Sequence, residues 1–210
     1  MNTKILRMLE LQNNMNLKVN PDWQHQNFAW YRAIWIECAE LLEHHGWKWW
    51  KKQTPDIEQI KLELVDIWHF GLSMLINEYK DHKLIAKNVS KELFQHHNDS
   101  SDFLENVELF AAQVLTQKKF PTAQFYALLD FLDMDFNELY RMYIGKNVLN
   151  FFRQDHGYKT GEYIKVWQGK EDNEYLVEII QQLDVNSETF QEDIYQQLSL
   201  AYEEKNSKLL

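Results

Sequence analysis

The chain has 210 residues, 45% of them hydrophobic and 14% aromatic, so it can bury a substantial core and fits one domain, or at most two small ones. Its formal net charge of −10 argues against nucleic acid or an anionic membrane as a general partner. The single cysteine, Cys38, cannot form an internal disulfide, no apolar run reaches transmembrane length, and no signal peptide is recognisable. We therefore expect a soluble, cytoplasmic protein.

Apolar residues recur with helical periodicity along most of the chain, and three Pro and six Gly leave few breaks for a β-rich fold. We predict an all-α helical bundle with a single domain over residues 1–210. The predicted helices cover residues 3–18, 28–45, 56–80, 82–96, 101–117, 121–133, 135–153, 173–183 and 188–205. The central stretch, about residues 81–134, carries no motif that we can match, and the sequence leaves open whether it is a mobile subregion.

Two pairs of carboxylates interrupt the apolar second and third predicted helices. Glu37 and Glu40 form the first pair, and Glu63 and Asp66 form the second. Residues three apart share a helix face, and apolar neighbours such as Trp35 predict that both helices are buried on most sides. Four buried carboxylates without compensation would repel one another and lose their hydration. Because hard oxygen ligands suit Mg²⁺ or Mn²⁺, the sequence predicts a divalent metal site.

Basic residues and glycines concentrate between residues 141 and 170. Six basic and two acidic residues give this segment a local charge of +4 in a chain of −10, and four of the six glycines lie there. Lys, Arg and Tyr side chains on a loop punctuated by glycine suit a phosphate clamp. The alternative is a solvated basic loop that neutralises nearby acid. The carboxylate pairs favour the clamp.

Three further features have both a structural and a functional interpretation. Gln12 and Asn16 continue an apolar helical stripe, so their amides either read a ligand or belong to a fraying helix end. The aromatic and basic patch at residues 47–51 could stack on a base or close the core. His69 follows Asp66 by three residues and is either a ligand contact or a buried core histidine.

The two carboxylate pairs resemble those of the all-α NTP pyrophosphohydrolases, the superfamily that includes MazG-like enzymes. Within it, the sequence looks like the dimeric dUTPases. The segments that carry this closer likeness are Leu11-Gln12 with Asn16, Trp47–Lys51, Glu63–Phe70, Tyr143–Gln154, Gly157–Trp167 and Gly169–Asn173. The resemblance implies a homodimeric enzyme that uses Mg²⁺-activated water to hydrolyse dUTP, and also dUDP, to dUMP.

The resemblance also implies roles for individual residues. The expected metal ligands and catalytic residues are Glu37, Glu40, Glu63 and Asp66. The chemistry asks one glutamate to take the proton of the attacking water; Glu37 is the first candidate, and the choice among the glutamates stays open. The expected phosphate contacts are Lys146, Arg153, Tyr158 and Lys165. The expected nucleoside contacts are Gln12, Asn16, Trp47, His69, Phe70 and Asn150. Which of Trp47, Trp49 and Trp50 lines the pocket stays open.

Three alternatives compete with this interpretation. Asp66-x-x-His69 distantly resembles the Glu-x-x-His motif of di-iron carboxylate bundles, but such bundles need the motif on two helices and the sequence offers no second copy. A nucleotide-binding module without turnover is the second alternative. The third is a pyrophosphohydrolase with another specificity, such as dCTP.

Overall fold

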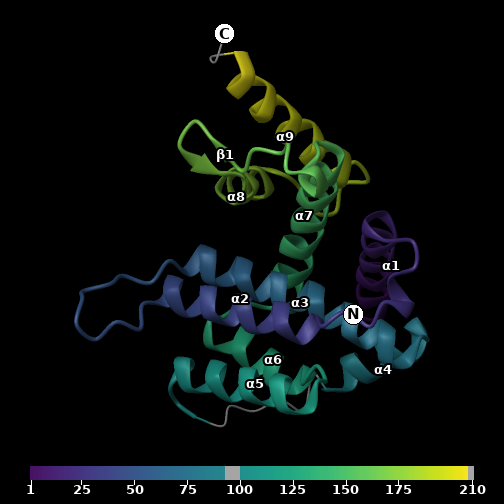
Figure 1. The fold of residues 1–210 in the computed structure, drawn as a ribbon, viewed down its shortest axis with the longest axis vertical. Helices are drawn as coiled ribbons and strands as arrows, with labels where there is room; N and C mark the ends of the chain where they lie inside the picture. The colour runs from purple at the N-terminus through teal and green to yellow at the C-terminus, as the bar shows by residue number, and fades with distance from the viewer. Residues whose placement is uncertain (93–99, 208–210) are drawn as a thin grey trace. The chain divides into compact units, whose positions relative to one another are not determined.

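The computed structural model describes residues 1–92 and 100–207 (Figure 1). Within these residues the fold is all-α, as predicted, and its only sheet is a hairpin of two short strands. The helix bounds closely match the predicted ones, apart from the predicted end at residue 96, which lies outside the described residues. The α-helices are α1 (Asn2–Val19), α2 (Trp30–His45), α3 (Ile57–Tyr79), α4 (His82–Glu92), α5 (Phe103–Gln117), α6 (Thr122–Phe131), α7 (Phe136–Asp155), α8 (Asp172–Gln182) and α9 (Phe190–Ser207).

The chain divides into two compact units, Met1–Tyr140 and Arg141–Leu210, and the boundary falls inside α7. The single domain over residues 1–210 stays a prediction. No helix among the residues that the structure describes is long and apolar enough to cross a membrane.

The first unit is built around the pair α2 and α3, which lie side by side and are joined by a long loop (Figure 1). Helix α3 begins at a cap in which the Asp56 carboxylate accepts the backbone N–H of Gln59. Helix α1 packs on α3 and α4, and α5 packs on α2 and α6. Because α3 contacts α1, α2 and α4, it forms the centre of this unit.

An aromatic cluster fills the core of the first unit. Trp68 on α3 stacks on Phe125 with ring centroids 5.1 Å apart, and Phe110 and Phe120 complete the cluster. Gly71, one helical turn after Trp68, lets the ring of Phe120 approach the backbone of α3. A Cβ at this position would lie 2.4 Å from the Phe120 ring, so only glycine fits without a shift of the ring or the helix.

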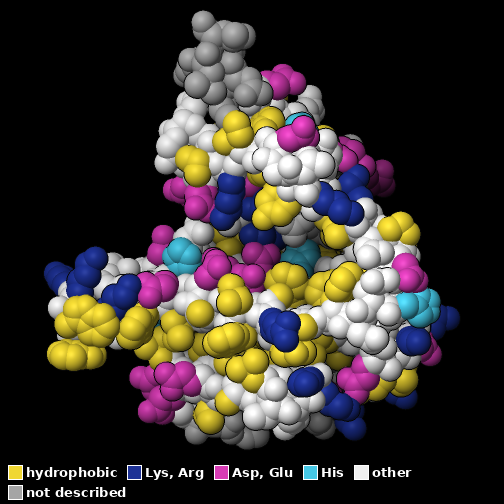
Figure 2. Space-filling view, in the orientation of Figure 1, with side chains coloured by type: hydrophobic (Ala, Val, Ile, Leu, Met, Phe, Trp, Pro, Cys, Tyr) yellow, Lys and Arg dark blue, Asp and Glu magenta, His cyan; other side chains and the backbone are white. Residues whose placement is uncertain are grey.

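The expectation that α2 is buried on most sides is wrong, because one face of this helix is exposed. Trp35 and Ile36 are 50% and 48% exposed, whereas the buried side of the helix is formed by Ile34, Cys38 and Leu41. Figure 2 shows hydrophobic side chains gathered over this helix and at the tip of the loop between α2 and α3. The apolar neighbours of the carboxylates therefore do not bury α2 on most sides.

The second unit contains the rest of α7, the hairpin of β1 (Val166–Trp167) and β2 (Lys170–Glu171), and helices α8 and α9. Gln168 and Gly169 both have positive φ angles, as a tight two-residue hairpin turn requires. The rings of Phe152, Trp167 and Tyr202 meet edge to face in the core. The first half of the predicted basic loop is thus helical, and the irregular part begins after Asp155.

Candidate functional site

Three carboxylates meet where α2 and α3 pack against each other. Glu37 on α2 and Glu63 and Asp66 on α3 each contribute an oxygen, and these oxygens all lie within 4.8 Å of one another. The spacing of three residues puts Glu63 and Asp66 on one face of α3, and the packing of α2 brings Glu37 to that face. Glu63 is only 4% exposed, and Glu37 and Asp66 are partly buried. The structure therefore brings three of the four expected metal ligands together.

Glu40, the fourth expected ligand, is exposed and does not belong to this group of three. Its negative charge still acts on Glu37 and contributes to the rise of the Glu37 pKa. Its role as a ligand stays a prediction.

The cluster strongly favours the protonated form of Glu37. Burial, followed by the negative charges of Asp66 and Glu63, raises the pKa of Glu37 to about 9. A divalent cation would relieve this repulsion, and carboxylate oxygens are the donors that Mg²⁺ and Mn²⁺ prefer. The donor set and its electrostatics thus fit a divalent cation.

We expect the stability of the EDTA-treated protein to fall as the pH rises from about 5 to about 9. Glu37 titrates near 4.5 in the unfolded chain and about 9 in the folded protein. Between these values the folded state holds the extra proton, so the free energy of unfolding decreases with rising pH. Thermal unfolding at a series of pH values measures this trend. Glu37→Gln removes the titrating group and should give a shallower decline, whereas equal slopes for the two proteins would refute the assignment.

His44 is a neighbour of the carboxylate cluster that sequence reasoning missed. Its Nε2 lies 3.3 Å from Oε1 of Glu63, and the side chain is partly buried. His44 follows Glu40 by four residues and Glu37 by seven, which places all three on one face of α2. This spacing was the sequence signal that could have identified His44 as a neighbour of the carboxylates. The contact offers Glu63 a polar partner from α2.

A buried polar network joins α1 to α3. Gln12 and Asn16 on α1 and His69 and Ser73 on α3 are each at most 6% exposed. Gln12 Nε2 donates to Asn16 Oδ1 (3.1 Å) and to Ser73 Oγ (3.0 Å). Asn16 Nδ2 donates to Ser73 Oγ at 2.9 Å, and His69 Nδ1 lies 2.7 Å from Gln12 Oε1. The amides of α1 are thus part of an ordered network, and the end of this helix is not frayed.

Ser73 was missed because a serine inside an apolar helix usually donates to its own backbone. It does so here, since its hydroxyl donates to the carbonyl of His69 at 3.1 Å. The signal that could have identified it was its spacing of four residues from His69.

The two aromatic residues expected in the nucleoside pocket have different surroundings. Phe70 is partly buried and stacks on Trp30, with ring centroids 6.1 Å apart. Trp47 lies on the loop after α2, is 46% exposed and packs edge to face on Trp50. Trp49 on the same loop is 90% exposed. The loop therefore presents its tryptophans to solvent, and a contact of Trp47 with a nucleoside stays a prediction.

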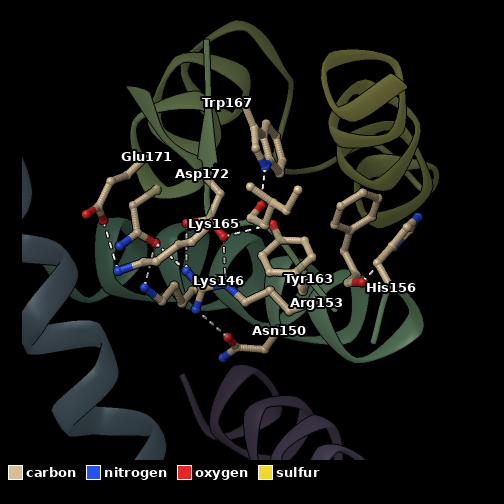
Figure 3. Close-up of polar contacts among 12 residues, drawn as sticks. Lys146, Asn150, Arg153, His156, Tyr163, Lys165, Trp167, Glu171 and Asp172 are labelled. Atoms are coloured by element: carbon tan, nitrogen blue, oxygen red, sulfur yellow. Dashed lines mark hydrogen bonds and ion pairs between the residues drawn. The ribbon is translucent and has the colours of Figure 1, made fainter. Parts of the chain in front are cut away.

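In the second unit, Arg153 binds a buried carboxylate (Figure 3). Its Nε and Nη2 each lie 2.8 Å from a carboxylate oxygen of Asp172, which is fully buried. The Tyr163 hydroxyl also donates to Asp172, at 2.9 Å. Burial would raise the pKa of Asp172, but the hydrogen bonds and charge of Arg153, helped by Tyr163, bring the pKa below its usual value. Arg153 thus has a structural task in addition to its expected contact with phosphate.

The other expected ligand contacts of this unit surround Arg153. Lys146 is 1% exposed and donates to Asn173 Oδ1 at 2.8 Å, and Asn150 Oδ1 accepts from Arg153 Nη1 at 3.3 Å. Figure 3 shows Lys146, Asn150 and Arg153 on α7 with the segment that carries Lys165 beside them.

Two expected phosphate contacts of this unit are exposed. Lys165 forms an ion pair with Glu171 at 2.9 Å, and both side chains are about half exposed. Tyr158 is 50% exposed, and the guanidinium of Arg153 lies 5.9 Å from the centre of its ring. Both side chains could reach a ligand from solvent.

Asp172 and Asn173 are the partners that sequence reasoning did not assign. They stand at the start of α8, directly after the hairpin, where a helix favours acidic and amide side chains. Their position was visible in the sequence, but nothing local indicated that they would face α7.

A comparison with protein families matches residues 4–158, most of the chain, to a family model described as dUTPase. A search among curated proteins gives no match.

Proposed function

Taking as premise that this chain belongs to the dUTPase family and hydrolyses dUTP to dUMP, we propose that it does so with Mg²⁺ bound at the α2–α3 carboxylates. The observation that supports this proposal is the meeting of Glu37, Glu63 and Asp66 within 4.8 Å in partly buried surroundings. Glu40, on the same helix as Glu37, completes the proposed set of ligands. Mn²⁺ has the same preference for oxygen and is the expected substitute.

Glu37 is the proposed general base. When bound, Mg²⁺ would neutralise phosphate charge and increase the acidity of a water molecule. The Glu37 carboxylate would then accept a proton from the attacking water. Burial and the neighbouring carboxylates raise the pKa of Glu37 to about 9 without metal, and a bound cation would lower this pKa and so keep the carboxylate deprotonated and able to accept a proton. Glu63 and Asp66 would hold the metal.

We further propose separate roles for the polar residues of each unit. In the first unit, Gln12, Asn16 and His69 recognise the base, and Phe70 and Trp47 contact the nucleoside. In the second unit, Asn150 reads uracil, and the phosphates are bound by Lys146, Arg153, Tyr158 and Lys165. Because these contacts would recognise mainly the nucleoside, which dUDP shares with dUTP, dUDP should also be a substrate.

A homodimer is the proposed assembly. The exposed Trp35 and Ile36 on α2 are apolar side chains of the kind that subunit interfaces cover. Light scattering after size-exclusion chromatography tests this: a mass of twice 25.4 kDa is expected. Trp35→Glu should shift the mass toward the monomer.

The metal and the base specificity can be tested in one experiment. We expect the protein to release pyrophosphate from dUTP, and phosphate from dUDP, with Mg²⁺ present. EDTA should abolish both reactions, and added Mg²⁺ or Mn²⁺ should restore them. A panel of dUTP, dCTP, dTTP and UTP measures specificity through kcat/KM. Faster turnover of dCTP than of dUTP would refute the proposed uracil recognition, and full activity in EDTA would refute the metal site.

A further inference from the structure

The hydroxyl of Ser73 has three polar neighbours within hydrogen-bond distance. A serine hydroxyl has one hydrogen, and that of Ser73 goes to the carbonyl of His69. The same oxygen lies 3.0 Å from Gln12 Nε2 and 2.9 Å from Asn16 Nδ2. With its hydrogen already donated, the oxygen can only accept from these two groups. Both amides must therefore turn their NH₂ ends toward Ser73.

This orientation fixes the amide of Gln12. Its Oε1 then faces His69, 2.7 Å from Nδ1. The reversed amide would bring Oε1 of Gln12 to the position that now donates to Asn16 Oδ1, and two acceptors would face each other. All these side chains are buried, so water cannot compensate for such a mismatch.

The orientation of Gln12 in turn selects the tautomer of His69. An amide oxygen only accepts, so the hydrogen of the neutral ring must sit on Nδ1. The ring nitrogen Nε2 then carries a lone pair and acts as an acceptor. Ser73 thus sets the orientation of Gln12, and Gln12 sets the tautomer of His69, through hydrogen bonds within and between α1 and α3.

We propose that Ser73 is a positioning residue that sets the tautomer of His69 through Gln12 and thereby favours uracil over cytosine. The selectivity part rests on the proposed function, in which His69 contacts the base. Uracil carries a hydrogen on N3 that a lone pair at Nε2 can accept. Cytosine has a lone pair at N3, so two acceptors would repel each other. Thymine shares the N3 hydrogen, so this network does not discriminate against it.

The tautomer can be measured without substrate. Nitrogen-15 spectra of the histidine side chains at about pH 8.5, where the unperturbed imidazole is neutral, distinguish Nδ1–H from Nε2–H. His69→Gln identifies the signal of His69. We expect Nδ1–H in the wild type. Ser73→Ala removes the acceptor shared by both amides, so Asn16 and Gln12 can turn together and the Nε2–H form should appear. Ser73→Thr keeps a hydroxyl and should retain Nδ1–H.

Ser199→Ala is the matched control for this measurement. Ser199 on α9 also donates to a carbonyl four residues back, that of Tyr195 at 2.9 Å, and lies outside the network. It should leave the His69 signal unchanged. If Ser73→Ala does not fold, Ser73→Cys, with a weakly accepting sulfur, makes the same comparison. An Nε2–H tautomer in the wild type, or an unchanged Nδ1–H tautomer in the Ser73 variants, would overturn the proposal.

The ratio of kcat/KM for dUTP to that for dCTP tests the selectivity. If the Nδ1–H form falls to about a tenth of the population in Ser73→Ala, the ratio should fall about tenfold. Ser73→Thr should keep a ratio near that of the wild type. A changed tautomer with an unchanged ratio would refute the link to base selection. Failure of the proposed function would appear separately, as a wild-type enzyme that does not prefer dUTP.

Discussion

Replacing Glu63 with Gln should lower the turnover of dUTP by about a thousandfold or more while leaving the fold intact. Glu63 is the most buried member of the carboxylate cluster and belongs to the group of three that meets within 4.8 Å. The amide keeps the shape of the side chain but removes one of the charges that would hold the metal. Initial rates with Mg²⁺ and calorimetric titration of Mg²⁺ should both show the loss.

The stability of the same variant separates a metal site from a structural one. Without metal, Glu63→Gln removes a negative charge beside Glu37 and Asp66, so its melting temperature should equal or exceed that of the wild type. Glu58→Gln is the matched control, because Glu58 is exposed in the first turn of the same helix. Wild-type turnover of Glu63→Gln at about millimolar Mg²⁺ would refute the proposed site.

Arg153→Ala should destabilise the second unit by about 3–5 kcal/mol, because it leaves the fully buried Asp172 without its counter-charge. Urea unfolding with hydrogen exchange on α7 and α8 measures this loss. Lys165→Ala removes a partner from the exposed pair with Glu171 and should cost less than about 1 kcal/mol. Combining Arg153→Ala with Asp172→Ala should recover part of the stability.

The pH dependence gives a second measure of the Arg153–Asp172 pair. The pKa of Asp172 is lowered in the folded protein, so the pair contributes its full stability above the unfolded pKa of about 3.8. That contribution is lost as the pH falls through the folded pKa. If Arg153→Ala unfolds like the wild type and only the KM for dUTP rises, Arg153 is a phosphate contact without a structural task.

The helices could be predicted from the sequence because their signal is local. An apolar period of 3.6 and a cap such as Asp56 act over a few residues, and the chain has few Gly or Pro to interrupt them. The meeting of Glu37 with Glu63 and Asp66 was also predictable, since each carboxylate pair lies within an apolar helix and the two helices follow one another in the chain.

The remainder of the site depends on contacts that no local pattern encodes. Asp172 lies 19 residues after Arg153, beyond a hairpin whose strands are two residues long, too short for a periodic signal. The exposed side of α2 was missed because Trp35 and Ile36 look like core residues until the positions of the packing partners are known. The proposed role of Ser73 depends on α1, whose register against α3 is set by tertiary packing.

The close approach of Phe120 to Gly71 fixes how far α3 can turn about its own axis. Any side chain at residue 71 would push this helix away from the ring or rotate it. The proposed metal ligand Asp66 and the proposed positioning residue Ser73 both lie on α3, so a rotation of this helix would displace both side chains together. The aromatic core thus limits the rotation of α3. Because Gly71 has no Cβ, the packing of Phe120 fixes the orientation of the proposed metal ligand and of the proposed base-selecting network at the same time.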